Sequence, residues 1–148
     1  MADEGKKQAD SPDEWQELAT DNLKAAQTLL ATGHWQQAFY SAGFAVECAL
    51  KCRIMRREGL NRWPERGERR EVYSHRLTAL AEVAGLQPFL LAEVYNDLTV
   101  LGLSWMVAKD WDNEIRYAPG AFPQVRARQM VEAVNDGGLL EWLLTPPS

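Results

Sequence analysis

The stretch that decides the fold runs from Trp35 to Arg57 and reads WQQAFYSAGFAVECALKCRIMRR. Its large apolar residues recur at the spacing of one broad helical face, with glutamines and charged residues elsewhere. Small residues between Ala38 and Ala45 would let another helix approach closely. The stretch therefore predicts a long helix at the centre of a helical bundle.

A second helix is predicted just before this one. The run Ser11-Pro12-Asp13-Glu14 can start it, since the serine hydroxyl can accept an early amide, proline suits the first turn and glutamate completes a capping box. Thr32-Gly33 supplies the stop, because glycine tolerates the left-handed cap conformation. The connection to Trp35 is so short that the two helices are expected to be antiparallel neighbours.

Downstream of the central helix the apolar pattern breaks and then resumes. Residues 59–73 hold a proline, two glycines and alternating charges without an apolar period, which predicts a long exposed loop. Ser74 can cap a third, short helix that ends at Gly85. Pro88 opens a fourth helix, which could continue to Trp111 with a bend at Gly102.

The end of the chain predicts one more helix. A turn at Pro119, which lacks an amide donor, comes first, and the last helix begins at Pro123 ahead of a short segment, 139–144. No stretch alternates at period two long enough to suggest a sheet. The sequence thus predicts an all-α fold, an up-and-down bundle of about five helices, with one domain over 13–145 after a flexible N-terminal tail over 1–12.

Composition indicates a single folded domain. The chain has 148 residues, of which 46% are hydrophobic and 25% charged, so it can bury a continuous core. No apolar run reaches the roughly 18 to 20 residues that span a bilayer, and the polar opening lacks the apolar middle of a secretory signal. We therefore expect a cytoplasmic protein without a membrane segment. Cys48 and Cys52 have no second ligand pair and predict reduced thiols, so neither a metal nor a cofactor is expected.

The net charge of −5 hides a local excess of positive charge. From Lys51 to Arg76 there are nine basic and four acidic residues, so this segment carries +5 and the remainder −10. A polyanion such as RNA would meet one basic face on an otherwise repelling molecule. The interleaved glutamates also favour a solvated loop in which arginines pair with them, and composition leaves both interpretations open.

Three motifs resemble the HEPN domains of higher eukaryotes and prokaryotes. Ala38–Lys51 is similar to the family's A-x-x-x-A-x-x-A-x-E-x-x-L-K helix. Ser74-His75-Arg76-Leu77 stands at the position of the family's H-x-L helix start, and Trp111–Pro119 resembles its W-x-x-x-x-R-Y-x-P ending. The likeness covers about residues 15–144, nearly the whole chain, and it implies a HEPN-like helical bundle.

The resemblance also has implications for function. HEPN proteins commonly form dimers, and many are metal-independent ribonucleases in which a catalytic Arg is followed four to six residues later by His. Arg116 fills the Arg position here, but no His follows it among residues 117–123. Since an imidazole is the usual base near neutral pH, its absence argues against ribonuclease activity. Small HEPN proteins are often paired with a nucleotidyltransferase, so the resemblance implies such a partner as well.

We therefore expect a non-catalytic, dimeric HEPN-like domain that binds a nucleotide, a nucleic acid or a partner protein. Arg116 is the main candidate, because its planar guanidinium could meet phosphate. Glu47 and Lys51 would face the same polar groove, and Trp111 and Tyr117 could stack on a base.

Each of these residues also has a structural interpretation. Glu47 and Lys51 fit a plain pair, four positions apart, on a helix surface. Arg116 follows three acidic residues and could pair with one of them, while Trp111 and Tyr117 could pack the turn against the bundle.

Two other functions are kept as alternatives. A ribonuclease could use Arg116 with His75 or with a group from a partner chain, but a His 41 positions away has no motif value and fits better a bond to a backbone group or carboxylate. A structural adaptor could use the apolar helix that begins at Pro88, or the last helix, as its interface.

Overall fold

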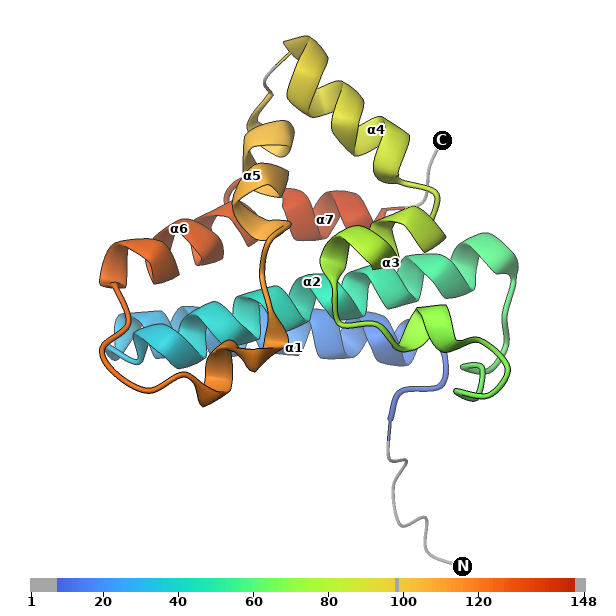
Figure 1. The fold of residues 1–148 in the computed structure, drawn as a ribbon, viewed down its shortest axis with the longest axis horizontal. Helices are drawn as coiled ribbons and strands as arrows, with labels where there is room; N and C mark the ends of the chain where they lie inside the picture. The colour runs from blue at the N-terminus through green and yellow to red at the C-terminus, as the bar shows by residue number, and fades with distance from the viewer. Residues whose placement is uncertain (1–7, 98, 146–148) are drawn as a thin grey trace, which may run out of the picture.

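Two long helices, α1 (Pro12–Ala31) and α2 (Trp35–Glu58), lie side by side and antiparallel at the base of the computed structural model (Figure 1). The structure describes residues 8–97 and 99–145, and over these ranges it contains helices and turns without any strand. The all-α prediction is therefore confirmed.

The start of α1 has the predicted capping box. The Ser11 hydroxyl accepts a hydrogen bond from the Glu14 amide at 3.1 Å, and Glu14 Oε1 accepts one from the Ser11 amide at 3.1 Å. Gly33, with a φ of 84°, lets the chain reverse into α2. The short connection thus produces the antiparallel pair that the sequence predicts.

Helix α2 is the centre of the bundle. Nearly all of it from Ala38 to Met55 is buried, because α1 covers one side while α3 (Leu77–Val83), α6 (Gln124–Val134) and α7 (Leu139–Leu144) pack around the rest (Figure 1). Alanine and glycine at many positions let these neighbours approach closely. The prediction of a close-packed central helix is confirmed.

The segment after α2 is less exposed than predicted. Trp63 and Val72 are buried, and a short 3-10 helix, η1 (Arg70–Tyr73), ends the segment. The Trp63 amide donates to Asp10 Oδ1 at 2.8 Å, and its indole lies edge-on to that of Trp15 with ring centres 5.0 Å apart. One aromatic residue within a charge-rich stretch therefore anchors it to α1, although the stretch has no apolar period.

The predicted tail, 1–12, lies partly outside the described residues, which begin at Gln8. Within the described part, Ala9 is buried and the Asp10 carboxylate accepts a hydrogen bond from the Trp63 amide. This end of the tail is therefore packed against the domain.

The prediction of one bent helix from Pro88 to Trp111 is wrong. The chain forms α4 (Gln87–Ala92) and a π-helical turn, η2 (Glu93–Asp97), and then reverses into α5 (Val100–Ala108). These elements project from the bundle as a hairpin, which we call the arm (Figure 1).

The reversal within the arm depends on two residues. Thr99 caps α5, because its hydroxyl accepts a hydrogen bond from the Gly102 amide at 3.1 Å. The predicted helix bend at Gly102 is absent. Gly102 instead allows α5 to pack closely against η2. A Cβ at this position would lie 2.7 Å from the Glu93 carbonyl oxygen. Thr99 and Gly102 can be identified in the sequence, but the position of the reversal becomes clear only from the close approach of Gly102 to Glu93.

The remaining boundaries agree with the sequence to within a few residues. The prediction that Ser74 caps α3 is wrong, because Arg76 occupies the N-cap position and no side chain caps the helix. The Ser74 hydroxyl accepts a hydrogen bond from the Arg76 amide at 3.0 Å. After α5 comes a 3-10 helix, η3 (Asn113–Tyr117), then the predicted turn at Pro119 and the start of α6 after Pro123.

Over the described ranges, no single helix is both long and apolar enough to cross a membrane. The helices over 77–83 and 87–95 are together long and apolar enough for a span, but they meet at an angle of 117°.

Candidate functional site

A buried ion pair lies in the middle of α2. Lys51 Nζ contacts Glu47 Oε2 at 3.0 Å, and the two residues are only 5% and 1% exposed. The interpretation as a plain pair on a helix surface is therefore wrong, because this turn of α2 is covered by other elements and does not face water. A buried charge that loses its partner costs several kcal/mol, so each member requires the other.

Two tryptophans enclose the ammonium group of this pair. Lys51 Nζ lies 5.2 Å from the ring centre of Trp15 and 5.7 Å from that of Trp63. Cation–π attraction is strongest for indoles and grows when the cation is removed from water. Lys51 therefore lies behind the molecular surface, between α1 and the loop after α2, and it is not among the residues that line the two cavities described below.

The Glu47 carboxylate also meets an imidazole. His75 Nδ1 lies 3.1 Å from both Glu47 Oε1 and Glu47 Oε2. Because a carboxylate can only accept, Nδ1 carries the proton, and in the neutral ring Nε2 keeps its lone pair. The predicted bond from His75 to a carboxylate is confirmed. This bond connects the motif over Ala38–Lys51 with the motif that begins at Ser74.

His75 is 49% exposed and lines a cavity of about 440 Å³, which we call the His75 cavity. Small-molecule sites in proteins typically have volumes of roughly 300 to 1,000 Å³. Two basic and two acidic side chains line the cavity, so it suits a ligand that carries both hydrogen-bond donors and acceptors. The other lining residues come from the start of α3 and from the chain that runs from the end of α5 to the first residue of η3: Arg76, Thr78, Lys109, Asp110, Trp111, Asp112 and Asn113.

The Trp111 indole is a fixed part of this wall. It is 3% exposed and fits against α2 at Gly43, where an added Cβ would come within 2.1 Å of its Nε1. Tyr40 lies beside it with ring centres 5.7 Å apart. Trp111 therefore packs the chain between α5 and η3 against the bundle, which agrees with the structural interpretation of this residue. Tyr117, for which the same interpretation was open, is 71% exposed.

Arg116 belongs to η3, but its side chain lies outside the described part of the structure. The phosphate contact and the ion pair within the turn therefore both stay predictions. Gln36 Nε2 donates to two carbonyl oxygens in and just after η3, which holds the backbone of this turn against α2. Since Asn113 lines the His75 cavity, the turn that carries Arg116 begins at the edge of that cavity.

No family model, curated protein or solved structure matches the chain. The HEPN resemblance stays a prediction that rests on the three motifs. The chemistry of the His75 cavity must then be inferred from the side chains that line it.

The basic segment is largely occupied by contacts within the protein. Arg53 donates to the carbonyl oxygens of Leu143 and Thr145, and Arg56 donates to that of Leu144 at 3.1 Å. These contacts favour the interpretation as internal pairing over that of a surface for polyanions. In the following loop Arg62 pairs with Glu68, and Arg69 pairs with Glu71 and with Glu58 at the end of α2.

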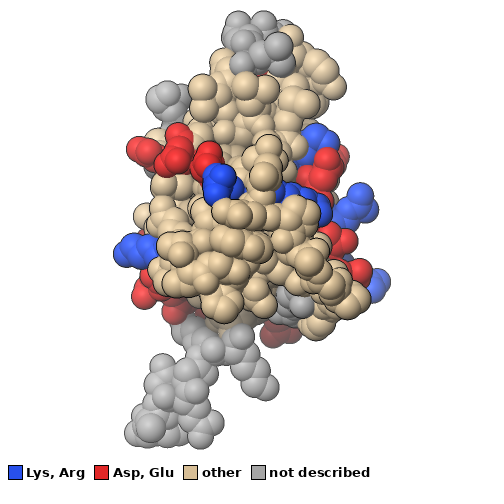
Figure 2. All heavy atoms as spheres, turned by 90° about the vertical axis from the view of Figure 1, so that its left-hand side faces the viewer, with Lys and Arg blue, Asp and Glu red and all other residues tan. Residues whose placement is uncertain are grey.

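The end of the bundle opposite the basic segment has mixed charge. Figure 2 shows the side at the left of Figure 1, where η3 and the start of α6 lie, with acidic and basic residues interspersed around an uncharged centre. In this view the described atoms form no broad basic surface of the kind that follows a nucleic-acid backbone.

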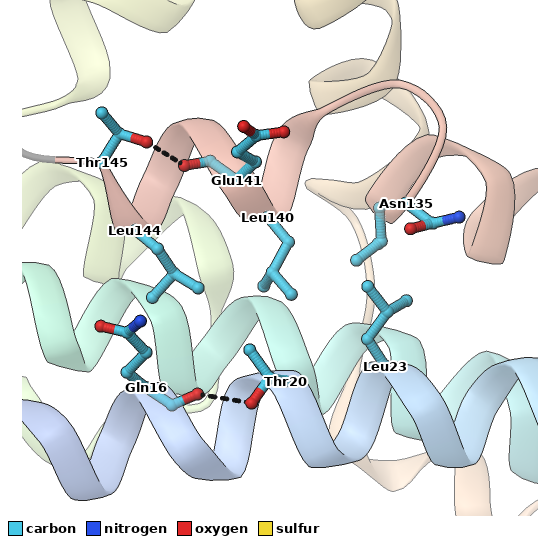
Figure 3. Close-up of a pocket in the computed structure, with 9 residues that line it drawn as sticks. Gln16, Thr20, Leu23, Asn135, Leu140, Glu141, Leu144 and Thr145 are labelled. Atoms are coloured by element: carbon cyan, nitrogen blue, oxygen red, sulfur yellow. Dashed lines mark hydrogen bonds between the residues drawn. The ribbon is translucent and has the colours of Figure 1, made fainter.

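A second cavity, of about 430 Å³, lies between α1 and α7 (Figure 3). Leu23 on α1 and Leu140 and Leu144 on α7 point into it, and Glu141 is the one charged residue among those that line it. It has neither a basic group nor an imidazole for an anionic ligand. The His75 cavity is therefore the stronger candidate site.

The cysteines take no part in either cavity. Cys48 and Cys52 are buried thiols, and burial raises the pKa of both, so they stay protonated and unreactive at neutral pH. Within residues 8–97 and 99–145, no group of three His, Cys, Asp or Glu side chains could hold a metal ion.

Proposed function

We propose that the domain binds a nucleotide in the His75 cavity and that it does so without catalysis. The observation that carries the proposal is an imidazole fixed in the cavity wall by the buried Glu47–Lys51 pair. Replacing a buried ion pair by an apolar pair of similar volume often costs a protein little or no stability. The charges therefore favour a role beyond stability, which is to hold His75 in one orientation.

The lining residues match the parts of a nucleotide. Arg76 and Lys109 can contact phosphate oxygens, while Asp112 and Asn113 can bond to ribose hydroxyls or to the edge of a base. His75 Nε2 adds an acceptor in a fixed position. Lys109 also contacts Asp110 at 3.1 Å, so a phosphate would compete with that carboxylate for the ammonium group.

Titration calorimetry with AMP, GMP, CMP and UMP tests this function on the whole chain. At least one of them should bind. Arg76→Ala should weaken binding about tenfold or more, since a hydrogen bond to a charged group contributes about 1.5 to 3 kcal/mol. His75→Ala should weaken binding about two- to tenfold, since a hydrogen bond between neutral groups contributes about 0.5 to 1.5 kcal/mol. Arg128→Ala, which changes an exposed arginine on α6, should leave the affinity unchanged. If none of the four binds at millimolar concentration, the proposal fails.

The resemblance to HEPN domains supports two further parts of the proposal. The absence of a His among residues 117–123 supports a non-catalytic role. A nucleotidyltransferase is proposed as the partner on the strength of the three motifs alone.

One observation favours a second candidate, an RNA-cleaving enzyme. His75 and the turn that carries Arg116 meet at one cavity although 41 positions separate them, and Glu47 orients the imidazole at Nδ1 as carboxylates do in general-base sites. His75 Nε2 could then take the proton of a ribose 2′-hydroxyl. The hydroxyl oxygen would attack the adjacent phosphorus, and the 5′ oxygen would leave and take up a proton.

Incubation of the pure protein with a structured RNA tests this candidate. His75→Ala and Arg116→Ala should each slow cleavage about 100-fold or more, because a positioned base contributes roughly that factor. Arg128→Ala again serves as the control. Cleavage that persists at an equal rate in both variants would come from contamination and would rule out the enzyme.

A further inference from the structure

The cavity between α1 and α7, which we call the α1–α7 groove, is apolar inside and polar at its edge. Leu23 on α1 faces Leu140 and Leu144 on α7, and all three side chains point into the gap (Figure 3). Glu141 is exposed, and its carboxylate points away from these leucines (Figure 3). An apolar centre inside a polar rim is the usual anatomy of a surface that binds a protein partner.

The hydroxyl protons of the groove are already used within the protein. The Thr20 hydroxyl donates to the carbonyl oxygen of Glu17 at 3.0 Å, and the Thr145 hydroxyl donates to that of Glu141 at 2.6 Å. The oxygens of these side chains keep lone pairs that can accept. The groove therefore suits a partner that is apolar in the middle and brings hydrogen-bond donors at its sides.

Both walls of the groove are acidic. Helix α1 (Pro12–Ala31) and residues 132–145 together contain seven acidic residues and one basic residue, Lys24, so the two walls carry a net charge of −6. The exposed acidic residues come from both sides of the groove: Asp13, Glu17, Asp21, Glu132, Asp136 and Glu141. A partner with positive charge is favoured here, because complementary charge selects partners and speeds their encounter.

Most of this negative charge is not neutralised within the protein. In the part of the chain that the structure describes, Glu17, Asp21 and Glu141 form no ion pair. Arg56 lies at one end of the groove, but its guanidinium donates to Gln16 Oε1 at 2.5 Å and lies 3.6 Å from Asp13. The carboxylates along the rest of the groove can therefore receive cations from a partner.

The size of the groove limits what can occupy it. Helix α7 has six residues, which at 1.5 Å per residue is about 9 Å, or fewer than two turns of a helix. A short groove between two helices suits a third helix, whose apolar side chains at i, i+3 or i+4 and i+7 enter it. So small a contact is typical of a weak, transient interface.

We propose that the α1–α7 groove binds a basic amphipathic helix of a partner protein. The apolar side chains of that helix enter between the leucines of α1 and α7, and its lysines or arginines lie over the acidic walls. The proposal goes beyond nucleotide binding and does not depend on it, since none of the residues that line the groove lines the His75 cavity.

Fluorescence anisotropy with a synthetic peptide tests the proposal on the whole chain. The probe has two heptads, with leucine at positions a, d and e and lysine elsewhere, which gives one apolar and one basic helical face. It should bind with a dissociation constant of roughly 1 to 100 µM. Raising the salt from about 50 mM to about 300 mM should weaken binding about fivefold or more, because ions screen exposed charges.

Two variants separate the acidic wall from the apolar interior. Glu17→Lys should weaken binding about fivefold or more, and Glu82→Lys, which reverses an exposed glutamate on α3, is the matched control and should not. Leu23→Ser should weaken binding about tenfold, whereas Val125→Ser, at an exposed valine on α6, should leave it unchanged. Circular dichroism confirms that each variant keeps its helices.

NMR of the wild-type chain locates the peptide without any substitution. Amide shifts should change along α1 and over 134–145. The proposal is overturned if the lysine peptide does not bind at about 100 µM, or if a peptide with glutamate in place of every lysine binds equally well. It is also overturned if Glu17→Lys and Glu82→Lys bind alike, or if the shifts change only in the arm, because the apolar arm would then be the binding surface.

Discussion

Replacing Glu47 with alanine is expected to lower the free energy of unfolding by about 3 to 5 kcal/mol. The substitution leaves the Lys51 ammonium buried between two indoles and removes the acceptor of His75 Nδ1. This loss is a large part of the roughly 5 to 15 kcal/mol that stabilises a typical domain. Urea unfolding followed by circular dichroism measures it.

The control and a double variant make this test specific. Glu17→Ala removes an exposed glutamate on α1 and should change stability by no more than about 0.5 kcal/mol. Glu47→Leu combined with Lys51→Met should recover most of the loss, because an apolar pair needs no counter-charge. That double variant would fold without an acceptor for His75, so it separates the site from the fold. Equal losses in Glu47→Ala and Glu17→Ala would mean that the pair faces water.

Gly43→Ala is expected to destabilise the protein by about 1 to 3 kcal/mol, as overpacking of a close contact does. The new Cβ would lie 2.1 Å from Trp111 Nε1, so the indole has to move away from α2. Because Trp111 also lines the His75 cavity, nucleotide binding should weaken together with stability. Thermal unfolding and calorimetry measure the two effects.

Gly67→Ala is the matched glycine substitution. A Cβ there would meet nothing within 4 Å, so the unfolding midpoint should stay where it is or rise slightly. If Gly43→Ala were as stable as Gly67→Ala, Trp111 could not be packed against α2 as described.

Local signals in the sequence predict the helices that local residues define. The capping box at Ser11 and Glu14, the glycine at position 33 and the long apolar face of α2 all depend on neighbours within a few positions. The arm and the burial of Trp63 depend on residues brought close by the fold. Nothing near Trp63 in the sequence indicates that Trp15 and Asp10 will cover it.

The candidate site shows the same limit. Glu47 and Lys51 have the spacing of a helix pair whether they face water or the core, and only the surrounding elements decide which. The bond between Glu47 and His75 joins residues 28 positions apart. Both residues lie in stretches that resemble the same family, which is compatible with a contact between them. Their spacing in the sequence alone does not predict it.

Helix α7 has six residues, too few for a helix that is stable alone in water. Its last carbonyl oxygens accept hydrogen bonds from the guanidinium groups of Arg53 and Arg56, which lie up to 90 positions earlier in the sequence. These positive charges also lie at the negative end of the helix dipole. The first half of the chain thus provides the cap for the final helix. A fragment that stopped before Leu139 would leave Arg53 and Arg56 without these acceptors, so removing α7 should also destabilise α2 at the centre of the bundle.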